Sequence, residues 1–120
     1  MGRKRVFGLV AAGVAASLAT AALAAPPKPA RCDVGNNYGE HYAGPCLFTA
    51  DRDGSFSVTR ARGAAIMGDI TRVTVQVVAP GAAEVRGLTR AGINSRWGHA
   101  QRSKRDRACW RGSDFWVCAY

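Results

Sequence analysis

The sequence predicts a small, mainly β domain, either an antiparallel β-barrel or a sandwich, stapled by disulfides and with little helix outside an N-terminal signal peptide. Three observations lead to this prediction. The chain of 120 residues has room for a single domain. Apolar and polar residues alternate with a period of two in its clearest patterned segment. Its four cysteines are an even number in a short chain that carries an export signal.

Residues 1–24 have the layout of a secretory signal peptide. A positive patch at residues 3–5 precedes an uncharged, alanine-rich run at residues 6–23. Ala22 and Ala24 are small residues at the positions that a signal peptidase reads, so we expect cleavage next to Ala24. The alternative is an uncleaved membrane anchor, since the run reaches the lower length limit of a membrane span. Cleavage would leave no integral membrane anchor in a secreted or periplasmic protein.

The first part of the mature chain is predicted to contain little regular structure. Residues 25–31 include three prolines and form a flexible leader in this interpretation, so a single β-rich domain covers residues 32–120. Residues 33–45 contain three glycines, two asparagines and a proline, which is typical of a loop. We expect at most a short strand there, at Tyr42.

Short strands separated by turn signals are predicted in the rest of the chain. The clearest is residues 70–79, where Val73, Val75 and Val77 alternate with polar residues as in a half-buried strand. Residues 63–69 have no assignable pattern, and residues 98–107 are polar and fit either a loop or a short helix. The predicted strands are residues 46–49, 55–60, 70–79, 83–89, 93–97, 109–111 and 115–119.

The cysteines predict two disulfides. Four cysteines allow three pairings, of which we favour Cys32 with Cys46 and Cys109 with Cys118. A chain this small buries a limited core, so cross-links are a common supplement. The spacings match no zinc-binding motif, so we expect no metal site.

The last strands are predicted to form a hairpin. If residues 113–114 are a two-residue turn, the last two cysteines face each other at a distance that a disulfide spans. In this register Arg111 lies opposite Trp116 on the face that carries the disulfide, which favours contact between the guanidinium and the indole. Trp110 then lies on the other face.

The positive charge is concentrated at the end of the chain. The net charge is +9, and loss of residues 1–24 would reduce it to +6. Residues 25–85 carry six basic and six acidic residues, whereas residues 86–120 carry eight basic and two acidic ones. Aromatic residues are interleaved there, and Trp and Arg are frequent anchors of interfaces.

Two interpretations of this charged region stay open. In the functional one, it binds an anionic partner: an acidic protein cleft, a lipopolysaccharide phosphate or nucleic acid. In the plainer one, the tryptophans pack in the core and the arginines are solvated. The sequence specifies no oligomeric state and does not separate a periplasmic from an extracellular location.

A catalytic interpretation rests on two histidines, His41 and His99. A small secreted ribonuclease needs two acid/base side chains and an arginine for the phosphate. The further candidates for such a site are Glu40, Glu84 and Arg86. The chain has no G-x-S-x-G or H-E-x-x-H motif and no glycine-rich phosphate loop before a helix. Because paired cysteines also leave no thiol nucleophile, we predict a non-catalytic binding module without a cofactor.

Two short segments resemble the small periplasmic inhibitors of c-type lysozyme. Residues 91–97, Ala-Gly-Ile-Asn-Ser-Arg-Trp, are similar to that family's Ser-Gly segment ending in Arg-Tyr, and residues 109–112, Cys-Trp-Arg-Gly, to its Trp-x-Lys-Gly segment. The resemblance implies a compact exported barrel that plugs the lysozyme cleft with a loop and a basic side chain. It also implies Ser95 and Arg111 as cleft contacts, with arginine replacing the family's lysine. The predicted partner-binding residues are Ser95, Arg96, Trp97, Trp110, Arg111 and Trp116.

Overall fold

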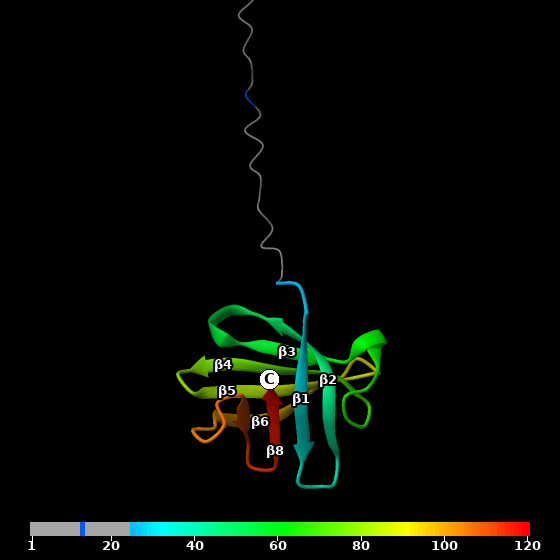
Figure 1. The fold of residues 1–120 in the computed structure, drawn as a ribbon, viewed down its shortest axis with the longest axis vertical. Helices are drawn as coiled ribbons and strands as arrows, with labels where there is room; N and C mark the ends of the chain where they lie inside the picture. The colour runs from blue at the N-terminus through cyan, green and yellow to red at the C-terminus, as the bar shows by residue number, and fades with distance from the viewer. Residues whose placement is uncertain (1–12, 14–24) are drawn as a thin grey trace, which may run out of the picture.

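The strands of the protein form a closed antiparallel barrel (Figure 1). The computed structural model describes Gly13 and residues 25–120, so the predicted signal peptide lies, apart from Gly13, outside the described residues. In the described part, eight strands follow each other around the barrel, and β8 pairs with β1 to close it. The fold class is therefore confirmed, as a barrel. The strands are β1 Lys28–Asn36, β2 His41–Ala50, β3 Phe56–Thr59, β4 Ile70–Ala79, β5 Ala82–Thr89, β6 Asn94–Arg102, β7 Cys109–Arg111 and β8 Phe115–Ala119.

Helix is scarce, as the sequence predicts. Over Gly13 and residues 25–120, helical structure consists of two three-residue 3-10 turns, Arg52–Gly54 and Ala61–Gly63. Within those same residues no helix has the length and apolar character needed to cross a membrane.

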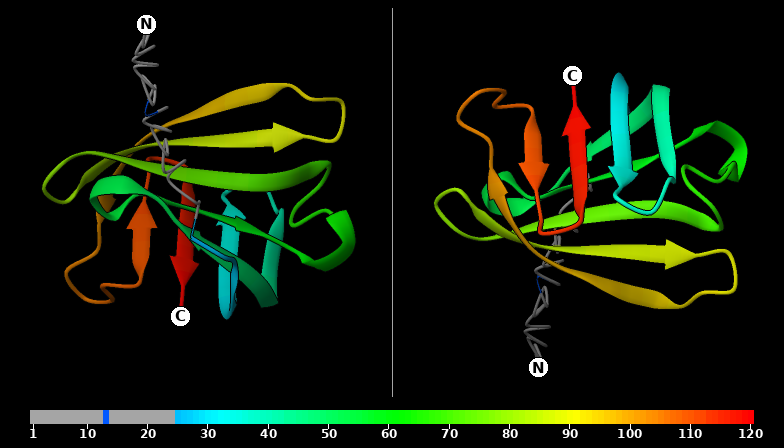
Figure 2. Two further views of the ribbon diagram at one scale, coloured as in Figure 1. Left: turned by 90° about the horizontal axis from the view of Figure 1, so that it is seen from above. Right: turned by 90° about the horizontal axis from the view of Figure 1, so that it is seen from below.

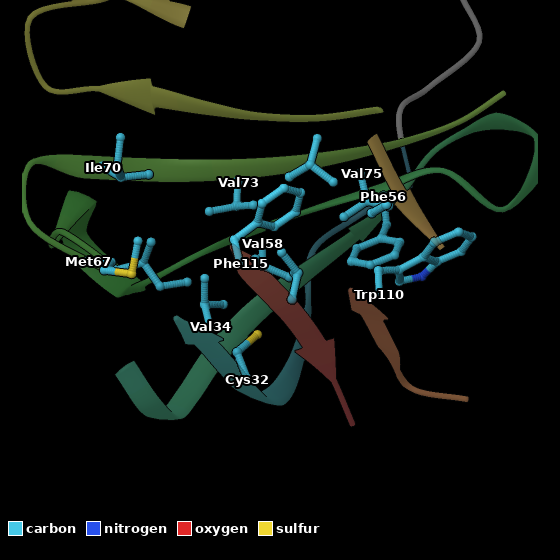
Figure 3. Close-up of a cluster of buried hydrophobic side chains, with 14 of the residues drawn as sticks. Cys32, Val34, Phe56, Val58, Met67, Ile70, Val73, Val75, Trp110 and Phe115 are labelled. Atoms are coloured by element: carbon cyan, nitrogen blue, oxygen red, sulfur yellow. The ribbon is translucent and has the colours of Figure 1, made fainter. Parts of the chain in front are cut away.

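The barrel interior holds the core because successive strand residues point to opposite faces. On β4, Val73 and Val75 are buried, whereas Arg72 is exposed on the outer surface. Figure 3 shows these valines facing Phe115 of β8 across the interior. Met67, from the segment without an assignable pattern, is buried in the same cluster beside Ile70.

Two predictions about the region of the first hairpin, β1–β2, are wrong. Residues 33–45 are not a loop: β1 pairs with β2 from Lys28 to Gly35, and the turn between them is short. The flexible leader is also shorter than expected, because β1 begins at Lys28 within residues 25–31. Two of the three glycines that indicated a loop, Gly35 and Gly44, instead make room for aromatic rings, and Gly39 lies in the turn. A Cβ on Gly35 would lie 2.3 Å from Cζ2 of Trp116.

Strand β6 is longer than the strand predicted at residues 93–97 and contains a β-bulge. β6 continues to Arg102, so residues 98–102 belong to a strand, and residues 103–107 form a loop as one of the two predicted alternatives has it. The pairing with β5 shifts by one residue at Trp97, and Gly98 takes a φ of 122°, a backbone conformation that glycine adopts without strain. Figure 2 shows the loop that follows β6 (orange) extending away from the barrel wall.

Both predicted disulfides are present. Cys32 is bonded to Cys46 and Cys109 to Cys118, with Cα–Cα distances of 5.8 and 4.0 Å. The register predicted for the last hairpin is also confirmed, since Cys109 lies opposite Cys118 and Arg111 opposite Trp116.

Candidate functional site

The six predicted binding residues do not form one surface, and Trp110 is part of the core. Its side chain points into the barrel and the residue is 5% exposed. The sequence predicts a guanidinium–indole contact between Arg111 and Trp116. Among the described residues, the guanidinium that lies over an indole is instead that of Arg102, whose Cζ lies 5.9 Å from the Trp110 ring centre. Trp110 is therefore a packing residue that a partner does not reach, which corrects its assignment to the binding surface.

Ser95, Arg96 and Trp97 lie far from Arg111 along β6. Ser95 is six residues from Gln101, the residue opposite Arg111, which corresponds to about 20 Å at about 3.3 Å per residue. The Ser95 hydroxyl donates to the carbonyl of Gly87 at 3.0 Å. Ser95 therefore shares no contact surface with Arg111, and Arg96 and Trp97 line a different cavity from the one that Arg111 lines.

The surroundings of Arg96 and Trp97 are acidic rather than basic. Arg96 donates through Nε and Nη2 to Glu84 at 3.3 and 3.2 Å, and the Trp97 ring meets Phe115 edge-on at 5.6 Å. A cavity of about 320 Å³ beside them, at one end of the barrel, is also lined by three carboxylates. No local sequence pattern indicates this cavity, because its carboxylates come from distant segments: Glu40, Asp69 and Asp114.

Arg111 and Trp116 line a separate depression on the outer wall of the barrel, which we call the hairpin hollow. It has a volume of about 340 Å³, and the Cys109–Cys118 disulfide forms part of its lining. Its residues come from β1, β2, β7, β8, the loop after β6 and the C-terminal residue. They are Asp33, His41, Asp106, Cys109, Arg111, Trp116, Cys118 and Tyr120.

Asp33 contacts two of the rings that line the hairpin hollow, those of His41 and Trp116. Its Oδ1 accepts a hydrogen bond from the Trp116 indole Nε1–H at 2.8 Å and lies 2.8 Å from Nε2 of His41. The rings of His41 and Trp116 are 5.7 Å apart and tilted by 56°. Three strands, β1, β2 and β8, thus hold one polar and aromatic group on the outer wall.

The pKa of Asp33 lies below its ordinary value of 3.8. Burial is the largest single influence and acts to raise the pKa. The hydrogen bond from Trp116, together with the hydrogen bond and charge of His41 and the charge of Arg31, outweighs burial. Asp33 is therefore held in its ionised form near neutral pH.

Tyr120 and Asp106 form the other wall of the hairpin hollow. The Tyr120 hydroxyl donates to Oδ2 of Asp106, and this bond, followed by burial and the Asp106 charge, raises the pKa of Tyr120. Backbone hydrogen bonds in both directions between Tyr120 and Arg31 continue the β1–β8 pairing to the end of the chain. The wall is thus fixed to the barrel.

The loop at residues 103–108, which we call the basic loop, lies next to this wall. Lys104, Arg105 and Arg107 are exposed on it. The Ser103 hydroxyl oxygen accepts from the backbone N–H groups of Arg105 and Asp106, each at 3.2 Å, and Oδ1 of Asp106 accepts from the Ala108 N–H at 3.1 Å. Side chains of the loop itself therefore fix its backbone.

The two histidines do not meet. His41 lies on β2 and His99 on β6, and three strands separate these strands in either direction around the closed barrel. Each faces its own carboxylate: His41 faces Asp33, and His99 Nδ1 lies 3.8 Å from Glu84. The barrel therefore does not assemble the two-histidine ribonuclease site within one chain. Over residues 25–120 no group of three metal-ligating side chains is present.

Comparison with protein-family models, with curated proteins and with solved structures finds no match in any of the three.

Proposed function

We propose that this chain is an exported, non-catalytic binding module that seats its basic loop on an acidic protein surface. The observation that carries the proposal is the fixed backbone of the basic loop, which presents Lys104, Arg105 and Arg107 to solvent from a disulfide-bonded barrel. Export is supported by the signal-like N-terminus and by the two disulfides, which persist in oxidising compartments.

Preorganisation favours binding at this loop. A flexible loop loses conformational entropy when a partner orders it, at about 1–2 kcal/mol for each residue whose backbone becomes fixed. The basic loop has already lost backbone freedom, because Ser103 and Asp106 hold its turn. Asp106, its single acidic residue, accepts hydrogen bonds from the Tyr120 hydroxyl and the Ala108 N–H and, among the described residues, makes no salt bridge with the cations of the loop. An acidic partner therefore meets positive charge on a defined shape.

The concrete version of the proposal is a protein similar to the periplasmic inhibitors of c-type lysozyme. A lysozyme cleft contains two carboxylates, which the guanidinium and ammonium groups of the basic loop complement. Arg111, at the position of the family's lysine, is exposed beside the loop. Ser95 lies too far along β6 to act with it, so in this version the basic loop and Arg111 carry the contact.

The test is inhibition of c-type lysozyme by the purified, oxidised protein. We expect inhibition at micromolar concentration. The variant with Lys104→Glu and Arg105→Glu should bind lysozyme with an affinity at least about tenfold lower, because the two new glutamates repel the carboxylates of the cleft. The matched control reverses Arg62 and Arg72, which are exposed away from the basic loop, and so changes the net charge by the same amount. It should leave inhibition close to that of the wild type.

Two outcomes contradict the proposal. Unchanged lysozyme activity at micromolar excess excludes the lysozyme version. The second outcome is that both double variants lose lysozyme binding equally, and that the protein binds lipopolysaccharide or nucleic acid with an affinity that falls steeply with salt. Diffuse positive charge rather than a loop-specific contact would then explain the interaction.

A further inference from the structure

The hairpin hollow contains a tryptophan that the core does not need. On β8 the buried Val117 points into the barrel, so its neighbour Trp116 points outward. Trp116 is half-buried there and lines the hollow. An indole on the outer wall of a small barrel adds a large apolar ring to the surface.

This ring is held in one orientation. A Cβ on Gly35 would lie 2.3 Å from Cζ2 and 2.8 Å from both Cε2 and Cη2, so the backbone of Gly35 covers one face of the indole. The hydrogen bond from the indole Nε1–H to Oδ1 of Asp33, 2.8 Å long, restricts rotation of the ring. The indole lines the hollow with the His41 ring tilted beside it at 5.7 Å, and the part of the ring that these neighbours leave accessible is a preorganised stacking platform.

Hydrogen-bonding groups of both kinds surround the platform. Arg111 supplies donors, and Asp33 keeps Oδ2 as an acceptor because Trp116 and His41 both contact its Oδ1. The charges are mixed, since Asp33 and Asp106 oppose Arg111 and the neighbouring Arg31. A polyanion would meet two carboxylates here, so the hollow favours a ligand that is neutral.

A ligand suited to this arrangement has an apolar face and hydroxyl groups that both donate and accept. A pyranose ring has both features. The volume of about 340 Å³ also lies within the range of about 300–1,000 Å³ typical of small-molecule sites. We propose that the hairpin hollow binds a neutral saccharide, with one sugar ring stacked on Trp116 and its hydroxyls bonded to Arg111 and Asp33. This site shares Arg111 with the proposed lysozyme contact but uses none of the cations of the basic loop. Sugar binding is measured without lysozyme and through Trp116, so its failure and the failure of lysozyme inhibition are distinguishable.

The experiment titrates the purified, oxidised protein with three neutral tetrasaccharides: maltotetraose, cellotetraose and tetra-N-acetylchitotetraose. Calorimetry gives the affinity, and NMR follows the three tryptophan indole N–H signals. We expect at least one sugar to bind and to shift the Trp116 signal more than those of Trp97 and Trp110. Trp116→Ala should weaken binding at least about tenfold, because it removes the stacking platform.

Gly35→Ala provides a second variant that keeps every aromatic side chain. Its new Cβ would displace the indole, so we expect binding to weaken at least about threefold while the barrel retains both disulfides. Tyr38→Ala is the control, because Tyr38 is an aromatic residue 78% exposed and does not line the hollow. It should bind as the wild type does.

The proposal is overturned if none of the three sugars binds, or if Trp116→Ala binds as well as the wild type. It is also overturned if the sugar shifts the signals of Trp97 or Trp110 instead. The wild-type NMR result requires no variant, so a failure of Trp116→Ala to fold would not protect the proposal.

Discussion

The indole nitrogen of Trp116 and Oδ1 of Asp33 lie 2.8 Å apart across the seam where β8 closes the barrel onto β1. The two residues are 83 positions apart in the chain. Their bond connects side chains on the outer wall, in addition to the contact of Trp116 with Gly35 and of Asp33 with His41. Because it depends on a carboxylate whose pKa is lowered in the folded protein, it makes the seam sensitive to acid.

Stability should decrease in acid through Asp33. The folded pKa lies below the unfolded value of about 3.9, so the contribution is present above that value and is lost as the pH falls through the folded pKa. The Asp33 side chain is 41% exposed, so we expect Asp33→Asn to cost no more than about 1 kcal/mol at pH 7. Urea unfolding at a series of pH values from 7 to about 2 measures the unfolding free energy of the wild type and of Asp33→Asn.

The difference in unfolding free energy between wild type and Asp33→Asn should shrink toward the acid end of that series. Taking this difference cancels the contribution of the other carboxylates, because they titrate in both proteins. A difference that stays constant down to the lowest pH would show that the charge of Asp33 does not stabilise the fold.

Ser55 is the subject of a second prediction. It is 8% exposed, and its hydroxyl oxygen accepts the backbone N–H of Val77 at 2.8 Å. Ser55→Ala would leave this part-buried N–H without its partner, at a cost of about 1–3 kcal/mol. Ser57→Ala, two residues further along β3, is the control and should stay within about 0.5 kcal/mol. Chemical denaturation measures both, and equal effects would show that the Ser55–Val77 bond is energetically unimportant.

Local patterns predicted the parts of the fold that depend on neighbouring residues. Of the alternating valines of β4, Val73 and Val75 are buried as expected and Val77 is partly buried. The two-residue turn at residues 113–114 set the register that pairs Cys109 with Cys118. Both features follow from geometry within one strand or one hairpin.

The first hairpin was missed because two of its glycines make room for aromatic rings. Gly35 makes room for Trp116, and Gly44 lies against the ring of Tyr42, with a Cβ there only 3.0 Å from the hydroxyl. In the sequence, these glycines are indistinguishable from those of a loop. The hairpin hollow was predicted only in part, as the pair Arg111 and Trp116, since the approach of Asp33 depends on barrel closure.

The two disulfides should contribute unequally. Removal of either one is expected to cost about 2–4 kcal/mol, and the loops they close differ too little in length to separate them. Cys32 and Cys46 also belong to the buried core cluster, so their replacement by alanine leaves a void inside the barrel.

We therefore expect the Cys32→Ala/Cys46→Ala protein to be less stable than the Cys109→Ala/Cys118→Ala protein by about 1 kcal/mol or more. Guanidinium unfolding of the two variants and the wild type gives the comparison. The reverse order would show that the link between β7 and β8, and not core packing, dominates.

The last prediction separates the shape of the basic loop from its charge. Ser103→Ala removes the acceptor for the N–H groups of Arg105 and Asp106 but leaves every cation in place. Amide hydrogen exchange at these two residues should become faster, while global stability changes by less than about 1 kcal/mol. If a fixed loop is what an acidic partner recognises, affinity should fall roughly three- to tenfold. Ser113→Ala, at an exposed position in the β7–β8 turn, is the control. Faster exchange without a loss of affinity would show that the charge of the loop suffices and that its shape does not matter for binding.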